Sequence, residues 1–235
     1  MSSRRLVAYL MFAIAAGMLC NGGAITALMT ADTYDFAAYY YAGRAVLNGQ
    51  NPYGDSPVTA QAEEDGVSRT PFIYSPLVAT LFAPIALLPF GVASRLAALL
   101  QLAALVAVAY LLAPYLLRDL DGDDRLLWAG FGALLLGAYH PAGYVLRVGQ
   151  ITFVIAALIL LSLKLANARR DLASGAALGV GLVLKPVCAP LLLYYLLKRK
   201  WTVAAGAGLV LMAAVVVGVL TLGADLHVEY LTRFG

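Results

Sequence analysis

Charged residues are scarce in this chain. Asp, Glu, Lys and Arg make up 12% of the 235 positions, whereas they make up about 25% of a typical soluble domain. The net charge is only +3, and no run alternates basic with aromatic residues, so the sequence gives no support for nucleic-acid binding. Hydrophobic residues fill 62% of the positions and the mean hydropathy is +0.83. This composition predicts an all-α polytopic membrane protein, because helices satisfy their own backbone hydrogen bonds in lipid.

Metal-binding and redox residues are also scarce. The chain has two cysteines and two histidines, and it contains neither a HExxH nor a CxxC motif, so a zinc site is not expected. Cys20 and Cys188 lie in apolar segments, where a thiol behaves as a small hydrophobic group and not as half of a disulfide. No glycine-rich nucleotide-binding loop is present. We therefore expect no metal and no cofactor.

Seven apolar stretches fit a bundle of about five to seven transmembrane or re-entrant helices, because a bilayer core needs about 20 apolar residues per span. Together they predict one membrane domain over residues 1–235. Two stretches are expected to be re-entrant: 127–139, which is short, and 172–197, which Lys185-Pro186 and Pro190 interrupt. The stretches are 6–29, 73–90, 92–117, 127–139, 150–166, 172–197 and 201–223.

The basic residues predict the orientation in the cell membrane, because lysine and arginine concentrate in cytoplasmic loops. This rule, with two re-entrant stretches, places the N-terminus in the cytoplasm and residues 30–72 in an extracytoplasmic loop. The residues expected inside are Arg4, Arg5, Arg95, Lys164, Arg169, Arg170, Lys198, Arg199 and Lys200. Those expected outside are Arg44, Arg69, Arg118, Arg125, Arg147 and Arg233.

The outer loop opens with TADTYDFAAYYYAGRAVLNGQNPYG. Apolar and aromatic residues recur in it at helical spacing, and Asn48-Gly49 is a helix-stop signal. We expect a short amphipathic helix on the outer membrane surface. The spaced residues are Phe36, Tyr39, Tyr40, Gly43, Val46 and Leu47.

Asp35 is the candidate catalytic residue of this loop. It lies just beyond the first apolar stretch, where restricted water would strengthen its electrostatics, and this is a suitable place for a general base. An equally good interpretation is that Asp35 complements the helix dipole, with Asp32 as the N-cap.

Candidate binding residues lie further along the chain. Lys185 stands in an apolar stretch, where an ionisable group suggests function, and a lipid phosphate would be its natural partner; alternatively it extends to an interface or pairs with a carboxylate. His140, Arg147 and Gln150 offer two cationic donors and an amide to an anionic or polyhydroxylated ligand, although each alone is usually an ordinary interfacial residue. Aromatic residues that could stack on a sugar, or form part of an interfacial belt, are Tyr39, Tyr53 and Tyr74.

The order of four segments resembles a known family. TYDFAAYYYAGRAVLNGQNPY follows the first stretch, FIYSPL enters the second, GQIT opens a later one, and LKPVCAPLLLYYLLKRKW comes last. This set resembles the polyprenyl-phosphate-sugar-dependent glycosyltransferases of the GT-C superfamily, specifically glycosyltransferase family 87, which includes mannosyltransferases acting on phosphatidylinositol mannosides.

The resemblance implies a reaction and a site. The donor would be a hexose, mannose-like, or a pentose on a polyprenyl phosphate, and a lipid or glycan acceptor would receive it with inversion on the outer face. Asp35 matches the family's catalytic aspartate, and the family's G-Q-x-N segment reads Gly149, Gln150, Ile151 and Thr152 here, with threonine replacing asparagine. Phosphate departure would be stabilised by Lys185, Arg147 or His140, and Gln150 would bind the sugar or acceptor. Because family members are usually longer, the resemblance also implies an N-terminal part that lacks some of the acceptor site.

A second class of function is a membrane transporter or flippase for a lipid-linked or anionic substrate, in which the interrupted stretch 172–197 would frame the substrate path. A third is a non-catalytic helical subunit. No internal repeat of the kind common in transporters is evident, and the long loop with its aspartate favours the enzyme.

Overall fold

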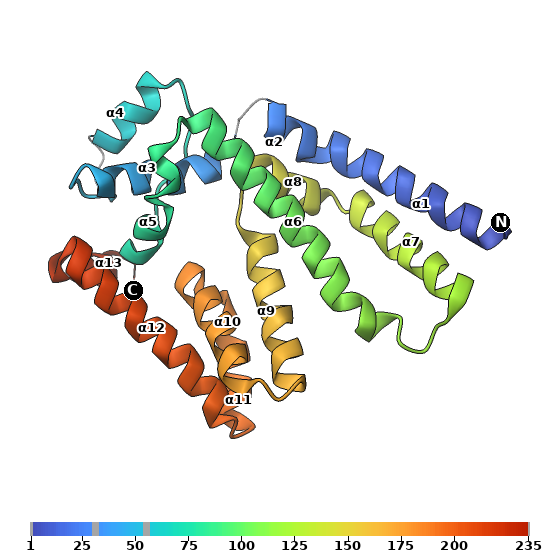
Figure 1. The fold of residues 1–235 in the computed structure, drawn as a ribbon. Helices are drawn as coiled ribbons and strands as arrows, with labels where there is room; N and C mark the ends of the chain where they lie inside the picture. Colours follow the sequence, from blue (N-terminus) through green and yellow to red (C-terminus); the bar gives the residue numbers. More distant parts are fainter. Residues whose placement is uncertain (1, 30–32, 54–56, 235) are drawn as a thin grey trace.

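A computed structural model describes residues 2–29, 33–53 and 57–234, and every regular element in these ranges is a helix (Figure 1). Three helical stretches are long and apolar enough to cross a membrane: one beginning at Ser3, then Phe90–Leu116 and Trp201–Leu222. A pair bent by 111°, His140–Val148 with Thr152–Asn167, would make a fourth, and shorter apolar helices complete the bundle. The prediction of an all-α polytopic membrane protein is confirmed.

The elements follow one another along the chain without a strand in the described part. Their bounds are α1 Ser3–Leu19, the π-helical turn η1 Cys20–Ala24, α2 Ile25–Met29, α3 Tyr34–Leu47, α4 Pro57–Glu64, α5 Pro76–Phe82, the 3-10 turn η2 Ile85–Leu87, α6 Phe90–Leu116, α7 Gly122–Ala138, α8 His140–Val148, α9 Thr152–Asn167, α10 Asp171–Leu184, the 3-10 turn η3 Pro186–Cys188, α11 Ala189–Leu197, α12 Trp201–Leu222 and α13 Ala224–Phe234.

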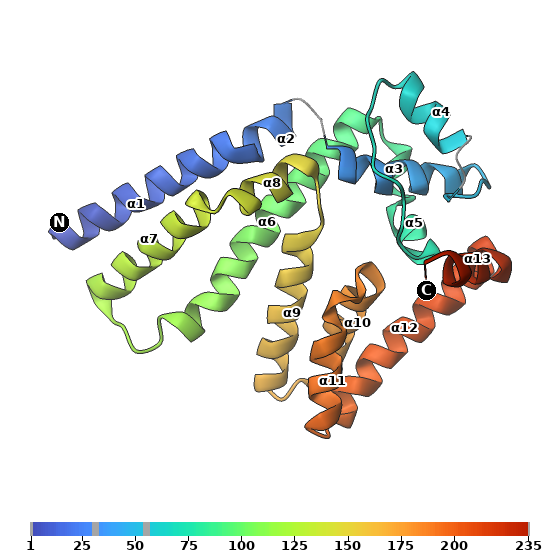
Figure 2. The same cartoon turned by 180° about the vertical axis from the view of Figure 1, so that it is seen from behind.

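Helices α1 and α7 lie side by side in parallel (Figures 1 and 2). Glycines of α7 face alanines of α1 one heptad apart, since Gly130 lies against Ala8 and Gly137 against Ala15. A Cβ at Gly137 would stand 2.8 Å from the Ala15 carbonyl oxygen. Small residues let membrane helices approach closely, and backbone packing then holds them together.

The parallel packing corrects part of the predicted topology. Asp123 and Asp124, which begin α7, pair with Arg5 at 2.6 Å and with Arg4 at 2.5 Å. The start of α7 therefore lies beside the N-terminus, and α7 runs along α1 away from it, so the expectation of a re-entrant 127–139 is wrong. For the same reason Arg118 and Arg125 lie at the end of the molecule that holds Arg4 and Arg5, not at the opposite end.

The stretch 73–90 does not form the expected crossing helix. Three prolines divide it into α5 and η2, because proline cannot donate the helical hydrogen bond. Both pieces pack on α3, where a Cβ at Gly43 would stand 2.7 Å from the Phe82 carbonyl carbon. Helix α6 consequently starts at this end of the bundle, and Arg95 donates to the Leu28 carbonyl at 3.1 Å. The placement of Arg95 with Arg4 and Arg5 is therefore wrong.

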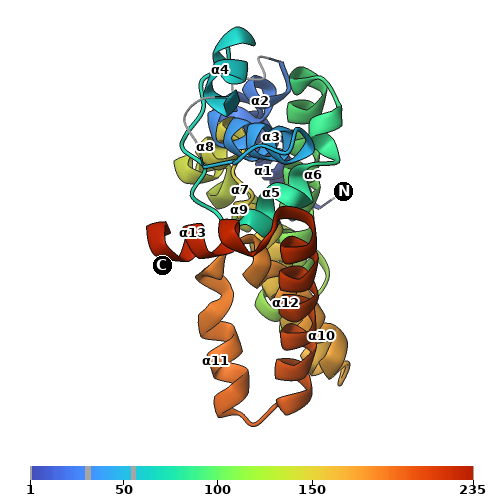
Figure 3. The same cartoon turned by 90° about the vertical axis from the view of Figure 1, so that its left-hand side faces the viewer.

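The stretch 172–197 forms a hairpin of two short helices, the shape that a re-entrant segment requires. Helix α10 ends at Leu184, the backbone is extended at Lys185, and α11 returns toward the end from which α10 started. An ion pair of 3.6 Å between Lys200 and Asp171 closes the hairpin at that end. Helix α12 then packs in parallel on α10 through Gly175, Gly179 and Gly206, and α13 lies across its far end (Figure 3).

Helix α3 occupies the range predicted for the loop helix and stops at Asn48. Nearly all its residues from Phe36 to Ala45 are buried, because α4, α5, η2, α6 and α8 surround it. It is thus enclosed by other elements and does not lie open on the surface as expected. Tyr41 and Arg44 both bind Asp65, at 2.7 and 3.3 Å, and so attach α3 to the loop that follows α4.

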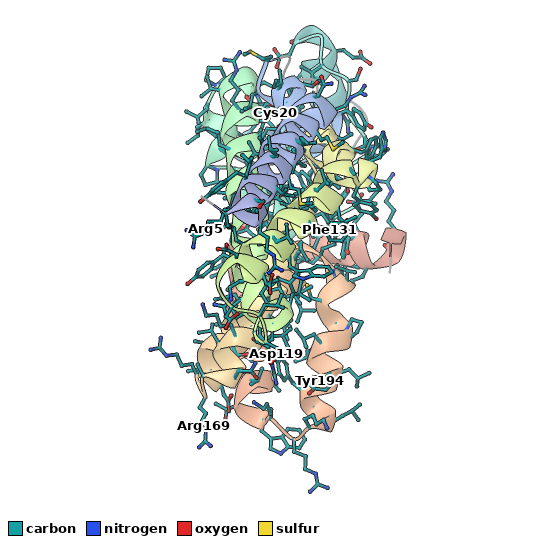
Figure 4. All side chains as sticks on the ribbon, turned by 90° about the vertical axis from the view of Figure 1, so that its right-hand side faces the viewer. Arg5, Cys20, Asp119, Phe131, Arg169 and Tyr194 are labelled. Carbon is teal, nitrogen blue, oxygen red and sulfur yellow. The ribbon has the colours of Figure 1, made fainter. Side chains whose placement is uncertain are left out.

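The corrected arrangement separates the basic residues by end. Asp119 and Arg169, labelled in Figure 4, lie away from Cys20. Arg5 belongs with them, because it pairs with Asp123 at the start of α7. Most lysines and arginines gather at this end, and the positive-inside rule predicts that such an end faces the cytoplasm. They are Arg4, Arg5, Arg118, Arg125, Lys164, Arg169, Arg170, Lys198, Arg199 and Lys200, whereas Arg44, Arg69, Arg95, Arg147, Lys185 and Arg233 lie toward the other end.

This topology predicts the accessibility of single cysteines introduced into a variant in which alanine replaces Cys20 and Cys188. We expect Asp119→Cys, Arg169→Cys and Arg199→Cys to resist a membrane-impermeant thiol reagent added outside the cell, and Ser68→Cys to react with it. The first three positions lie at the end that carries most lysines and arginines, and the positive-inside rule predicts that this end faces the cytoplasm. Labelling of Asp119→Cys from the same side as Ser68→Cys would contradict the parallel packing of α1 and α7.

Candidate active site

The site is built on the first turn of α3. Thr33 precedes this turn, and its buried hydroxyl lies 2.7 Å from the hydroxyl of Ser94 on α6, which anchors the start of α3. Asp35 follows in the first turn and is half-buried. A carboxylate here is stabilised by the partial positive charge at the helix N-terminus.

Gly149 brings a distant segment against this turn. It ends α8 in the left-handed conformation, with φ of 75°, which glycine adopts without strain. A Cβ at this position would stand 2.7 Å from Phe36 Cβ and 3.1 Å from Thr33 Cβ. Only glycine therefore lets the chain lie this close to α3. As a result the next residue, Gln150, lies within hydrogen-bond distance of Asp35.

Asp35 receives a hydrogen bond on each carboxylate oxygen. Gln150 Nε2 donates to Oδ2 at 2.6 Å, and Thr70 Oγ1 donates to Oδ1 at 3.1 Å. The Thr152 hydroxyl in turn donates to Gln150 Oε1 at 3.3 Å. An ionised carboxylate has about four lone-pair positions, so both oxygens of Asp35 can still accept a proton from a hydroxyl group.

Helix α8 supplies a second contact to this turn. The hydroxyls of Tyr34 and Tyr144 lie 2.6 Å apart. This hydrogen bond and partial burial raise the pKa of Tyr34 to about 12, Asp35 adds to the rise, and the charge of Arg147 opposes it. Arg147, one turn after Tyr144, thus contributes positive potential at the start of α3.

The three predicted tyrosines form one aromatic group beside Asp35. Tyr39 lies one turn after Asp35, and its ring centroid is 4.8 Å from that of Tyr74. Tyr53 donates to the Tyr74 carbonyl oxygen at 2.6 Å and stacks on Tyr230 of α13. The sequence predicted a common role for these three residues in stacking on a sugar. In the structure they lie together, but Tyr39 and Tyr53 are buried and only Tyr74 of the three is partly exposed.

Lys185 lies on the far side of Tyr74. Both residues line a cavity of about 410 Å³ between α5, the end of α10, α12 and α13, with otherwise mainly apolar walls. Lys185 is half-buried, and its ammonium group makes no hydrogen bond or ion pair within the described ranges. The Ser75 hydroxyl, which also lines the cavity, is buried without a hydrogen-bond partner among the described residues. Buried polar atoms are normally paired, so this pocket suits a ligand with a polar or anionic group.

His140 is separate from these groups. It is exposed at the start of α8 and, as far as the structure describes the chain, its imidazole makes no hydrogen bond or ion pair. Conversely, sequence reasoning missed Thr70, Tyr34 and Tyr144. Thr70 carries no motif, and its role depends on a fold contact, since its backbone N–H donates to the Tyr34 carbonyl at 3.2 Å.

The model of glycosyltransferase family 87 matches residues 72–234. The chain belongs to this family. The matched range contains Tyr74, Gln150 and Lys185 and begins after Asp35.

A curated relative is 29% identical over 188 residues, which cover 79% of this chain and 43% of the relative. It is the polyprenol-phosphate-mannose-dependent alpha-(1-2)-phosphatidylinositol pentamannoside mannosyltransferase of Mycolicibacterium smegmatis. The chain thus spans less than half the length of this relative. No solved structure matches the family 87 chain.

The contact of Gly149 predicts a specific effect of a single methyl group. We expect Gly149→Ala to lower the free energy of unfolding by about 1–2 kcal/mol because of the left-handed backbone, and by about 1–3 kcal/mol more because the methyl group overpacks on Phe36. The same methyl group should displace Gln150 from Asp35. Gly49→Ala is the matched control, because Gly49 has φ of 64° but no atom within 4 Å of its Cβ position. Thermal unfolding in detergent would measure the difference, and equal losses in the two variants would contradict the contact.

Proposed function

We propose that this family 87 chain transfers a hexose, mannose-like, or a pentose from a polyprenyl-phosphate donor to a hydroxyl group of a lipid or glycan acceptor. Family membership and the printed activity of the relative support the reaction class. The observation that carries the proposal is Asp35, a half-buried carboxylate held on both oxygens beside an aromatic group and a lysine-lined cavity.

Asp35 serves as the general base. It accepts the proton of the acceptor hydroxyl while that oxygen bonds to the anomeric carbon from the face opposite the phosphate. The bond between the anomeric carbon and the phosphate oxygen breaks in the same step, so the configuration inverts. The leaving group is a polyprenyl phosphate anion, which needs no proton, so one carboxylate suffices.

Lys185 binds the phosphate of the donor. Its ammonium group is a compact positive charge suited to an anion, and it lines a cavity whose apolar walls fit the first isoprenyl units. Stabilising the charge that develops on the leaving phosphate accelerates its departure. Arg147 is a second candidate for this role because its charge acts at the start of α3, and His140 has only its position on the same helix as support.

The sugar lies between the base and the phosphate site. Tyr39 and Tyr74 connect Asp35 with the cavity of Lys185, and Tyr53 holds the Tyr74 backbone. Tyr74 is partly exposed and offers an apolar ring face for stacking on a sugar, whereas Tyr39 and Tyr53 are buried and support it from behind. Gln150, also predicted to contact the sugar or acceptor, already donates its amide to Asp35.

The site belongs to the extracytoplasmic face in this proposal. The end of the bundle that carries Asp35 and Lys185 has fewer lysines and arginines than the opposite end. This difference supports a cytoplasmic N-terminus in a multi-pass protein of the cell membrane. A lipid-linked donor fits this location. Its sugar is already activated by the phosphate link, so no nucleotide sugar is needed on that side of the membrane.

A transporter or flippase for a lipid-linked or anionic substrate is the second candidate. The broken hairpin of α10, η3 and α11 and the cavity at Lys185 favour it, since transporters place substrates beside interrupted helices. The two functions differ in their product, because only the enzyme forms a new glycosidic bond.

The proposal predicts the effect of removing the base. In membranes that contain equal amounts of protein, we expect Asp35→Asn to lower the rate of labelled sugar transfer from a polyprenyl-phosphate donor by about 10²–10⁴-fold. Asp119→Asn, an exposed aspartate at the opposite end, is the matched control and should transfer at the wild-type rate. Equal transfer by wild type and Asp35→Asn would exclude Asp35 as the base, and movement of the lipid without a covalent product would favour the transporter.

A further inference from the structure

We infer that Gln150 and Thr70 are positioning residues, which hold the carboxylate of Asp35 in one orientation, and that Gln150 does not bind the sugar. This inference rests on the proposed function, because it assigns these residues through the base on which they act.

Both polar atoms of the Gln150 side chain, the amide nitrogen and the amide oxygen, already make hydrogen bonds. Its Nε2 lies 2.6 Å from Asp35 Oδ2, a short distance typical of a hydrogen bond to a charged acceptor. Because an ionised carboxylate can only accept, the amide nitrogen must be the atom that faces it. The amide oxygen then accepts from Thr152 at 3.3 Å. A sugar hydroxyl would have to compete with these two contacts.

Thr70 holds the other carboxylate oxygen. Its hydroxyl donates to Oδ1 at 3.1 Å, and its backbone N–H donates to the Tyr34 carbonyl at 3.2 Å. These two contacts fix Thr70 against the same turn that carries Asp35. Thr70 lies outside the helices, so its attachment to α3 determines where its hydroxyl points.

The two donors act together because they come from different parts of the chain. The terminal torsion of an aspartate is broad, so a carboxylate without partners rotates readily. Donors from residue 70 and residue 150, one on each oxygen, select one rotation and keep the remaining lone pairs aimed at the acceptor hydroxyl. Orientation of a reacting group in this way increases kcat and has little effect on ground-state binding.

Steady-state kinetics of sugar transfer test this assignment with the full chain in membranes. Gln150→Met keeps the length of the side chain but loses the amide, and Thr70→Val loses only the hydroxyl. We expect each to lower kcat by about 10- to 100-fold, the effect of one hydrogen bond to a charged group, with nearly unchanged KM for donor and acceptor. Thr70→Ser, which restores a hydroxyl, should recover most of kcat. Thr221→Val, which alters a hydroxyl bonded within α12, should behave as wild type.

A double-mutant cycle separates positioning from binding. In an Asp35→Asn background we expect Gln150→Met to have little further effect on the residual rate, because the carboxylate it positions is absent. A raised KM with unchanged kcat in Gln150→Met, or an equal loss with and without Asp35, would overturn the inference and assign Gln150 to the sugar, while the base itself would stand. Wild-type transfer that does not depend on Asp35 would instead overturn the proposed function and the inference with it.

Discussion

The missing side chain at Gly149 lets the end of α8 lie directly on the first turn of α3, and the site depends on this contact. Any Cβ there would overlap Phe36, so the backbone approach exists only with glycine. The contact places the amide of Gln150 on Asp35, a residue 115 positions earlier in the chain. Partly burying a carboxylate without hydrogen-bond donors would cost desolvation free energy. The donors of Gln150 and Thr70 offset this cost and fix the orientation of the Asp35 carboxylate.

The helical bundle positions this contact through close backbone packing. In lipid no hydrophobic force drives apolar helices together, so small residues and polar contacts determine which helices pair. Gly130 and Gly137 set α7 on α1, and Gly175 with Gly206 sets α12 on α10. Helix α8 follows α7 along the chain, so the packing of α7 on α1 brings α8 against α3, where the Asp35 site forms. The second pair brings Lys185 to the cavity at Tyr74, so the proposed base and the proposed phosphate-binding lysine each depend on one parallel helix pair.

Local signals predicted the elements that depend on local chemistry. The aromatic spacing predicted a helix that ends at Asn48, and Pro186 with Pro190 predicted the break between α10 and α11, both as observed. The grouping of Gln150 with a polar pocket also came from sequence, although its contact with Asp35 did not, because two segments so far apart are related only by the fold.

The errors in topology came from interactions that are not local. Counting arginines alone placed Arg118 and Arg125 outside, but Asp123 and Asp124 bind the N-terminal arginines and fix that turn at the same end. The stretch 73–90 is apolar enough for a span, yet its prolines and the contact of Phe82 with Gly43 keep it at one end. Thr70 could not be identified from sequence, because an isolated threonine before a proline has no signature and acquires its role from the Tyr34 backbone.

The anomeric configuration of the product tests the central claim most directly. A single displacement assisted by one aspartate requires the new glycosidic bond to have the configuration opposite to that of the sugar in the donor. We predict inversion when the product formed from a polyprenyl-phosphate sugar of known configuration is examined by NMR spectroscopy. A product with retained configuration would contradict the role of Asp35 as the sole base, since retention requires a second displacement on the enzyme.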